Sequence, residues 1–305
     1  MKCFYHNDLD GRCAAAILYN HRKAIGTKSR HGETYIEMDY DRAFPFDEVL
    51  ADEEVFILDF SLQKEGEFQR LLEITPNVVW IDHHKSAIEK HAALVESQED
   101  TCAPIRGIQD TSKAGCVLTW EFLNTAPLPE VVELVGDYDI WAFEFGDRTR
   151  DLHAGMVLEE TDPTHPNWDT WLSDWALPAY DLINNGGVLR KASKKKATDL
   201  IKQIGFHAEF EGYRCICCNN PRKGSGVFDS VDPTSYDFMF SFFCSDRGWT
   251  VSLYNSKGLD GTELARKYGG GGHPGACGFQ CKQLFFKDGK VEVITECERM
   301  ARSKL

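Results

Sequence analysis

Short apolar runs that end in a carboxylate or a histidine recur along the chain, and the clearest is residues 78–81. Its sequence, VVWI, leads directly into Asp82, His83 and His84. An uninterrupted apolar run predicts a strand buried on both faces, as in parallel sheets. Open α/β folds place their sites at the carboxyl ends of such strands, so these three side chains are candidates for metal binding or proton transfer. The alternative is that Asp82 caps the next helix and both histidines lie on the surface.

Two further segments show the same arrangement. Residues 2–5 form a short strand that ends at the sequence HNDLDG, and residues 54–60 form an apolar strand that ends at Asp59. Helical segments follow at residues 12–19 and 63–74. Strands that alternate with helices predict a parallel α/β sheet, in which the strands end along one edge. The polar groups at these three ends are therefore expected to converge as a metal cluster.

His6, Asp8 and Asp10 alternate along the first of these motifs. In an extended segment alternate residues share a face, so all three side chains are expected to point the same way. Two adjacent carboxylates repel, and a bound divalent cation relieves that repulsion. An Asp-rich turn that caps the following helix is the alternative.

A fourth acidic position follows a predicted helix at residues 129–135. Asp137 and Asp139 both lie in the sequence GDYDIW. Either can ligate a metal while the other anchors the loop, and of the two we assign Asp137 to the cluster.

Another helix is predicted to begin in the sequence DTSKAG and to run to about residue 123. Thr111 or Ser112 is the expected N-cap. Ser112 and Lys113, near the helix start, are candidate contacts for a substrate phosphate, although a solvated lysine is the more common role.

The last part of the chain has a different pattern. The sequence NNGG at residues 184–187 is expected to interrupt the chain, and from residue 206 alternating apolar positions predict several strands. The length of 305 residues also favours two domains. The predicted parts are a metal-binding catalytic domain of residues 1–185, a linker helix of residues 186–205 and a substrate-binding domain of residues 206–305.

The sequence GGGGHPGACGF at residues 269–279 is a candidate anion site. A loop of this kind exposes successive backbone N–H groups, which suits a phosphate or a carboxylate. Gly270, Gly271 and Gly272 are the expected backbone contacts, and His273 adds a donor that can be cationic. A flexible glycine linker is the alternative, but the His-Pro pair and the strands on either side argue against it.

Composition narrows the class of partner. The chain carries 34 basic and 48 acidic residues, a formal net charge of −14, which disfavours long duplex DNA. A short anionic substrate attracted by bound cations remains compatible with this charge. No apolar run approaches the roughly 18 residues of a membrane span, and no signal peptide is expected at the start.

The 11 cysteines are an odd number scattered among apolar segments, which favours a reduced, cytoplasmic protein. Cys215, Cys217 and Cys218 form a C-x-C-C cluster without the usual spacing of a zinc site. Because Cys215 and Cys217 alternate along a predicted strand, we interpret them as core residues.

Five motifs in order resemble the DHH phosphoesterase superfamily. They are the sequence HNDLDG, Asp59, the triplet DHH at residues 82–84, Asp137 and the sequence GGGGHPGACGF. The resemblance covers nearly the whole chain. It is strongest to the branch with a C-terminal DHH-associated domain, which includes nanoRNases, RecJ-like nucleases and related bacterial phosphatases. It implies an α/β fold with an N-terminal parallel-sheet domain, a smaller C-terminal α/β domain and an active site in the cleft between them.

The resemblance also implies two manganese ions, for which Mg²⁺ or Co²⁺ can substitute. Many members space the first motif as H-x-x-x-D-x-D, whereas this chain has H-x-D-x-D. The implied ligands are His6, Asp8 and Asp59 for one ion, and Asp10, Asp59, His83 and Asp137 for the other, with Asp59 bridging.

The implied activity is manganese-dependent hydrolysis of short single-stranded oligonucleotides to nucleoside monophosphates, by in-line attack of a hydroxide shared between the metals. His84 would lie beside the scissile phosphate, and His273 would grip the substrate together with Gly271 and Gly272. A phosphomonoesterase, a cyclic-dinucleotide phosphodiesterase and an exopolyphosphatase are alternatives that use the same site. A module that only senses a nucleotide is the alternative without catalysis. The resemblance also suggests a homodimer.

Overall fold

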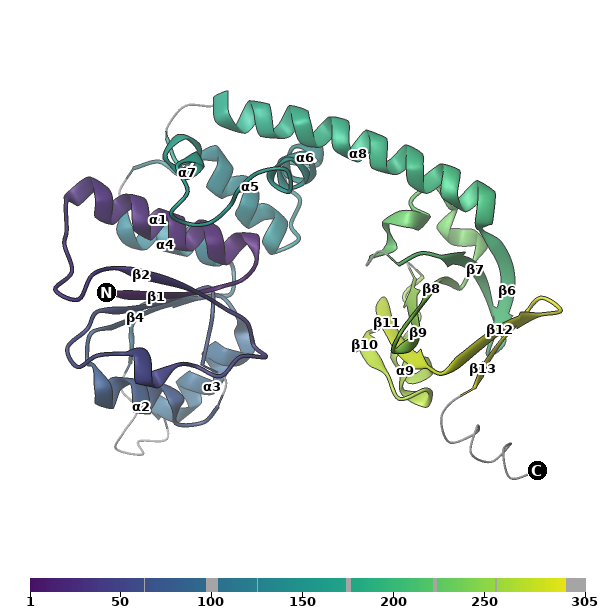
Figure 1. Cartoon of the computed structure of the whole chain (residues 1–305), viewed down its shortest axis with the longest axis horizontal. Coiled ribbons are helices and arrows are strands. Elements are labelled where there is room, and N and C mark those ends of the chain that lie inside the picture. The colour runs from purple at the N-terminus through teal and green to yellow at the C-terminus, as the bar shows by residue number, and fades with distance from the viewer. Residues whose placement is uncertain are drawn as a thin grey trace. The chain divides into compact units, whose positions relative to one another are not determined.

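The computed structural model describes residues 1–62, 64–96, 104–124, 126–173, 177–221, 224–255 and 257–294. The chain divides into two compact units, Met1–Arg190 and Lys191–Leu305, each with its own sheet (Figure 1). Unit 1 is Met1–Arg190 and unit 2 is Lys191–Leu305.

Unit 1 is built on a five-stranded sheet in which every pair of neighbouring strands is parallel, as predicted. The strand order is β2-β1-β3-β4-β5, so the order reverses beside β1. In open α/β sheets the carboxyl ends of the strands at such a reversal form a crevice for ligands. The strands are β1 (Lys2–His6), β2 (Thr34–Met38), β3 (Val55–Leu58), β4 (Val78–Asp82) and β5 (Arg106–Gln109).

Helices cover both faces of this sheet (Figure 1). Because side chains alternate along a strand, the strands contribute to two cores. Phe56 and Ile81 pack with α1, α4 and α5, whereas Ile57 and Trp80 pack with α2 and α3 on the other side. The helices of unit 1 are α1 (Leu9–Ile25), α2 (Glu67–Ile74), α3 (Lys85–Glu96), α4 (Gly115–Leu123), α5 (Glu130–Asp139), α6 (Asp147–Met156) and α7 (Asn167–Trp171), with a 3₁₀ turn at Phe46–Glu48. The helix α8 (Leu177–Ile204) begins in unit 1 and continues into unit 2.

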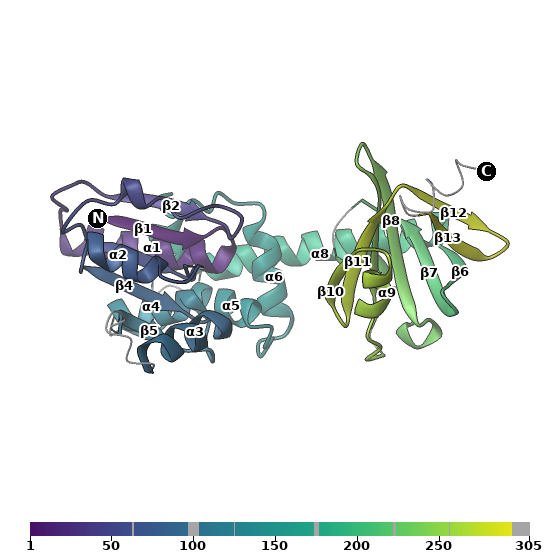
Figure 2. The ribbon, with the colours of Figure 1, turned by 90° about the horizontal axis from the view of Figure 1, so that it is seen from below.

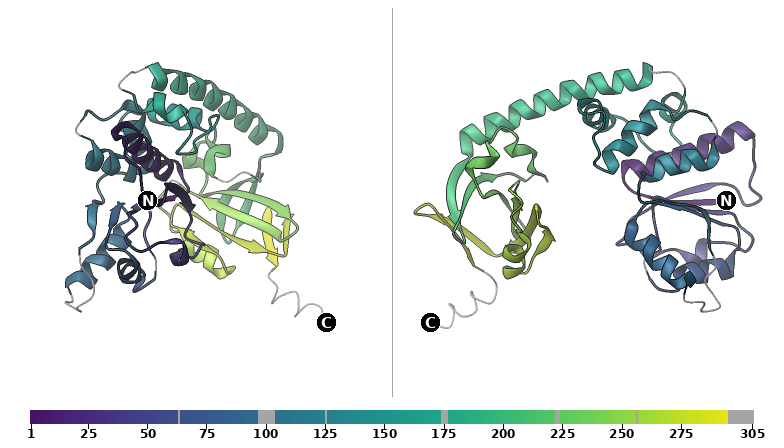
Figure 3. Two further views of the ribbon diagram at one scale, coloured as in Figure 1. Left: turned by 60° about the vertical axis from the view of Figure 1, so that its left-hand side comes forward. Right: turned by 180° about the vertical axis from the view of Figure 1, so that it is seen from behind.

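The predicted interruption at residues 184–187 is wrong, because α8 continues through it as one helix (Figure 3). The glycines there allow close packing of α8 on α6. A Cβ on Gly186 would lie 1.7 Å from the carbonyl oxygen of Asp151, and a Cβ on Gly155 would lie 2.1 Å from that of Leu182. Within the described ranges, no helix is both long enough and apolar enough to cross a membrane.

Unit 2 is built on an eight-stranded, mostly antiparallel sheet, ordered β10-β11-β9-β8-β7-β6-β13-β12 (Figure 2). The pairs β7–β8 and β6–β13 are parallel. Cys215 and Cys217, on β7, are buried in its core, as expected. The elements are β6 (Phe206–Phe210), β7 (Tyr213–Asn219), β8 (Phe238–Ser245), β9 (Gly248–Tyr254), α9 (Thr262–Lys267), β10 (Gly271–His273), β11 (Ala276–Cys281), β12 (Gln283–Lys287) and β13 (Lys290–Ile294), with 3₁₀ turns at Ser225–Phe228 and Pro233–Ser235.

Candidate metal centre

The carboxyl edge of the unit 1 sheet gathers the histidines and carboxylates of the first motifs. His6 is the last residue of β1, Asp59 follows β3, and His83 and His84 follow β4. Three sets of side chains each offer ligand atoms that all lie within 4.8 Å of one another. The sets are His6, Asp8 and Asp59; Asp10, His83 and Asp139; and Asp59, His83 and His84.

Asp59 connects these sets. Its Oδ1 lies 3.1 Å from His83 Nε2, and its Oδ2 lies 3.7 Å from His6 Nδ1. Beyond it, His6 Nδ1 is 2.7 Å from Asp8 Oδ2, and His83 Nε2 is 3.3 Å from Asp139 Oδ2. One carboxylate therefore faces two neighbouring groups of ligands, as a carboxylate that bridges two metal ions would.

The environment of Asp59 suits a metal ligand. The residue is 1% exposed, yet neither carboxylate oxygen has a hydrogen-bond partner among the described residues. The imidazoles of His6 and His83 lie near these oxygens without forming hydrogen bonds to them. An ionised carboxylate buried in this way is unfavourable, and a bound cation removes that penalty. The residues present therefore fit divalent metal ions with oxygen and imidazole ligands.

The pKa values reflect the crowded charges. Burial raises the pKa of Asp59 to about 8; contact with His6 opposes this and the charge of Asp8 adds to it. Burial and the charge of Asp10 raise the pKa of Asp139 to about 7. Burial alone would lower the pKa of His6, but contacts with Asp59 and Asp8 outweigh it and raise the pKa to about 10.

These values predict how the metal-free chain responds to pH. Folded Asp59 and Asp139 keep their protons to about pH 8 and pH 7, whereas the unfolded chain loses them near pH 3.8. The folded state therefore binds more protons in this window, and the free energy of unfolding should fall as pH rises from about 4 to about 8. His6 adds to the fall between pH 6.5 and about pH 10.

Urea unfolding in EDTA at pH 5 and pH 8 measures this effect. The double variant Asp59→Asn/Asp139→Asn is the matched control and should show a smaller loss between the two pH values. Added Mn²⁺ should restore stability at pH 8 to the unsubstituted chain alone, since metal binding displaces the protons. A metal-free chain that becomes more stable from pH 5 to pH 8 would contradict these assignments.

The alternation of His6, Asp8 and Asp10 predicted one extended segment, and this prediction is wrong. Asp8 is the N-cap of α1, with its carboxylate accepting from Gly11 N at 2.9 Å, and Asp10 lies in the first helical turn. The alternative of a capping Asp is thus correct for Asp8, while His6 and Asp8 still lie together.

Asp10 is held by the start of α4. Its carboxylate accepts hydrogen bonds from Gly115 N at 2.7 Å and Cys116 N at 2.9 Å. The predicted N-caps Thr111 and Ser112 are wrong, because α4 begins at Gly115 and Asp10 supplies the capping carboxylate from a distant part of the chain.

The two candidate phosphate contacts have other partners, since Ser112 N donates to Asp110 and Lys113 Nζ pairs with Glu121 at 2.7 Å.

Gly115 was not identified from the sequence, and only the three-dimensional contact explains it. A Cβ at this position would lie 2.6 Å from Asp59 Cβ and 3.0 Å from Asp10 Oδ2. Gly115→Ala should therefore displace Asp59, lowering the free energy of unfolding by about 1–3 kcal/mol and Mn²⁺ affinity by at least about tenfold. Urea unfolding and metal titration measure the two effects. Gly226→Ala is the control, because a Cβ there would meet nothing within 4 Å; equal behaviour of the two variants would refute the steric argument.

The structure favours Asp139 over Asp137 as the fourth acidic member of the cluster. The predicted helix at residues 129–135 extends to Asp139 as α5, and residues two apart on a helix point to nearly opposite sides. Asp137 is buried and accepts hydrogen bonds from Glu144 N, Phe145 N and Thr149 Oγ1. Asp139 instead faces His83.

Asp82 organises the end of β4. Its Oδ1 accepts from the backbone N–H groups of His83 at 2.8 Å and His84 at 3.2 Å, and it lies 2.6 Å from His84 Nδ1. The contact with Asp82 raises the pKa of His84. Asp82 thus fixes the His84 ring and favours its protonated form, at the edge of the cluster.

Tyr40 is a neighbour of the cluster that the sequence did not indicate. Its ring centroid lies 5.3 Å from that of His6 and 5.9 Å from that of His84, and the ring stacks on Phe60. Tyr40 follows β2, a strand that was not predicted, because only one of its five residues is fully buried and its sequence, TYIEM, lacks an apolar run.

The glycine stretch lies in unit 2 and is more ordered than an open loop. Gly271–His273 form β10, which pairs with β11, while the N–H groups of Gly269 and Gly270 bond to carbonyls of α9. His273 is exposed. Gly270 and Gly271 line an open pocket of about 900 Å³. The other residues that line it are Asn220, Pro221, Phe243, Thr250, Val251, Ser252, Tyr254, Gly269, Ala276, Cys277, Gly278, Phe279 and Gln280.

Residues 3–136 match the family model described as the DHH family, N-terminal domain. The matched residues contain the five-stranded parallel sheet and every member of the cluster except Asp139, so this part of the chain is similar to the DHH family, as the sequence motifs predicted. An uncharacterised protein, R106, of Acanthamoeba polyphaga mimivirus is 23% identical over 243 residues, which are 75% of this chain and 53% of that protein. The chain thus spans about half the length of this curated relative.

Two solved structures share the fold over 99% of this chain. The pGpG-specific phosphodiesterase PggH of Vibrio cholerae has a TM-score of 0.50 at 13% identity, with 97% of that chain covered. A DHH domain from a member of the s1p family of ribosomal proteins has a TM-score of 0.52 at 14% identity, with 84% of that chain covered. At these identities the similarity concerns the fold.

Proposed function

We propose that the chain is a metal-dependent phosphodiesterase that hydrolyses short oligonucleotides to nucleoside monophosphates, with two Mn²⁺ ions as cofactor. The observation that carries this proposal is Asp59, a buried carboxylate without hydrogen-bond partners among the described residues, which faces two sets of ligand atoms. One ion would be held by His6, Asp8 and Asp59, and the other by Asp10, Asp59, His83 and Asp139.

A pair of divalent ions supplies two effects when bound at such a site: a shared water with a lowered pKa and neutralisation of the phosphoryl oxygens. The side chains supply the remaining chemistry. Asp82 holds His84 and raises its pKa, so His84 is placed to donate a proton to the leaving oxygen. Asp10, held by the N–H groups at the start of α4, keeps its orientation without help from the substrate.

A short substrate fits the remaining observations best. The net charge of −14 opposes binding of a long polyphosphate backbone. PggH, which shares the fold, is named for activity on the dinucleotide pGpG. In unit 2, Gly271, Gly272 and the exposed His273 are the proposed contacts for a substrate phosphate.

One set of assays distinguishes the related activities. Purified chain is incubated with Mn²⁺, Mg²⁺ or Co²⁺ and each of four substrates: a dinucleotide, a cyclic dinucleotide, adenosine 3′,5′-bisphosphate and inorganic polyphosphate. Fastest release of nucleoside monophosphates from the dinucleotide, abolished by EDTA, supports the proposal. Preference for another substrate would assign that activity instead, and tight binding without hydrolysis would indicate a sensor.

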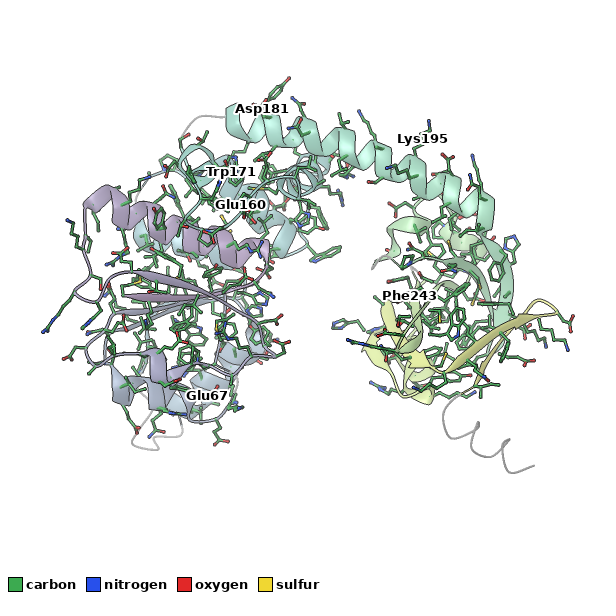
Figure 4. All side chains as sticks on the ribbon, viewed as in Figure 1. Glu67, Glu160, Trp171, Asp181, Lys195 and Phe243 are labelled. Carbon is green, nitrogen blue, oxygen red and sulfur yellow. The ribbon has the colours of Figure 1, made fainter. Side chains whose placement is uncertain are left out.

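The matched control for substitutions in the cluster is Asp181→Asn, an equal change of charge at an exposed position on α8 (Figure 4). It should leave the rates unchanged.

A further inference from the structure

The loop after α5 presents an exposed tryptophan beside the candidate metal centre. Trp141 is 71% exposed, the same fraction as Val157 and more than any other large apolar residue among those described. It follows Asp139 by two residues, so their Cα atoms are separated by at most about 7 Å. Asp139 itself lies 3.3 Å from His83. The backbone that carries this indole therefore lies close to the candidate metal centre.

The backbone of this loop is held in an unfavourable conformation. Trp141 has a φ of 56° and Phe143 a φ of 51°, values that residues with side chains rarely adopt. Such strain persists only where the surrounding structure enforces it, and it is concentrated at functional sites.

Asp137 enforces the conformation. Its carbonyl oxygen accepts from Ala142 N at 3.2 Å and Phe143 N at 3.5 Å, and its carboxylate accepts from Glu144 N at 2.8 Å and Phe145 N at 3.4 Å. Four successive N–H groups thus converge on one buried residue. The residue that the sequence suggested as a metal ligand instead fixes the loop that carries Trp141.

Two neighbouring rings contact the indole. Phe143 meets Trp141 edge to face, at 5.3 Å between centroids and 87° between planes, and Tyr138 lies at 6.0 Å. Both supports are themselves held, Phe143 by the Arg150 guanidinium at 4.0 Å and Tyr138 by stacking on His153 at 3.6 Å. The loop therefore presents a pre-positioned aromatic surface to solvent.

We propose that Trp141 is a stacking surface for a nucleobase of the substrate, next to the phosphate that is cleaved. This rests on the proposed function and extends it, because it names the part of the nucleotide that unit 1 recognises. A nucleobase is the fitting occupant, since its flat face matches an indole and stacking accepts every base. A site of this kind makes the enzyme depend on a base but not on its identity.

The test compares Trp141→Ala and Trp141→Phe on an intact dinucleotide and on two analogues, each lacking one base. Stacking of one base corresponds to about 5- to 150-fold in affinity. Trp141→Ala should lower kcat/KM for the intact dinucleotide by about 10- to 100-fold, mainly through KM, while Trp141→Phe retains most of it. On the analogue that lacks the stacked base, Trp141→Ala and the unsubstituted chain should be equal. Tyr180→Ala, at an exposed aromatic on α8, is the control and should have no effect.

Equal losses for Trp141→Ala on the dinucleotide and on both analogues would overturn the inference, because they would indicate a general disturbance of the site. No loss on any substrate would overturn it as well. If the unsubstituted chain hydrolyses no dinucleotide, the proposed function fails separately. Calorimetric titration with AMP and Mn²⁺ then decides the stacking, since equal affinity of the unsubstituted chain and Trp141→Ala would refute it.

Discussion

Replacing Asp59 with asparagine is expected to lower kcat/KM for a dinucleotide by at least about 10³-fold. The change preserves the size of the side chain but removes the carboxylate that faces both sets of ligands. Neither metal position would then have its shared anionic ligand, so calorimetry should also show a loss of high-affinity Mn²⁺ binding. The loss should persist at saturating substrate, because the carboxylate acts on the reacting centre rather than on the remote parts of the nucleotide.

The stability of the Asp59→Asn variant distinguishes a direct loss of catalysis from misfolding. Because burial raises the pKa of Asp59 to about 8, ionising it opposes folding, and Asp59→Asn should leave the metal-free chain as stable as before or more stable. Asp181→Asn should match the unsubstituted chain in both activity and stability. An Asp59→Asn variant that is folded and retains its activity would exclude Asp59 from the reaction.

Asp139→Asn and Asp137→Asn should change different properties of the chain: the first its affinity for Mn²⁺, and the second its stability. Asp139→Asn is expected to weaken Mn²⁺ binding by at least about tenfold, with no loss of stability, since it removes a buried carboxylate whose pKa is raised to about 7. Asp137→Asn is expected to lower the free energy of unfolding by about 1–3 kcal/mol, because the amide cannot accept every hydrogen bond that the carboxylate accepts. Its Mn²⁺ affinity should change by less than about threefold.

Calorimetric metal titration and urea unfolding of both variants make this comparison. The two substitutions are chemically identical and only two residues apart, so each is the control for the other. Weak metal binding in Asp137→Asn together with destabilisation of Asp139→Asn would reverse the assignment made from the structure.

The parallel sheet and most of the cluster were predictable from local sequence. The runs before Asp59 and Asp82 are apolar because β3 and β4 are buried on both faces, and the polar residues that follow necessarily lie at one edge of the sheet. That logic needs only the order of elements along the chain. It is enough to bring His6, Asp59 and His83 together.

The other features of the site and the fold depend on contacts that sequence patterns do not encode. The choice between Asp137 and Asp139 turned on whether α5 ends before or after them, since a helix separates the two side chains and an extended segment does not. The role of Gly115 depends on the distance to Asp59 across the fold. Gly186 resembles a helix breaker in sequence but serves as a contact between α6 and α8.

Anomalous diffraction at the manganese edge, from crystals of the chain grown with Mn²⁺, tests the central claim most directly. Two peaks are expected, one beside His6 and Asp8 and the other beside Asp10, His83 and Asp139, with Asp59 in contact with both. A single peak away from Asp59, or none at this edge of the sheet, would contradict the account.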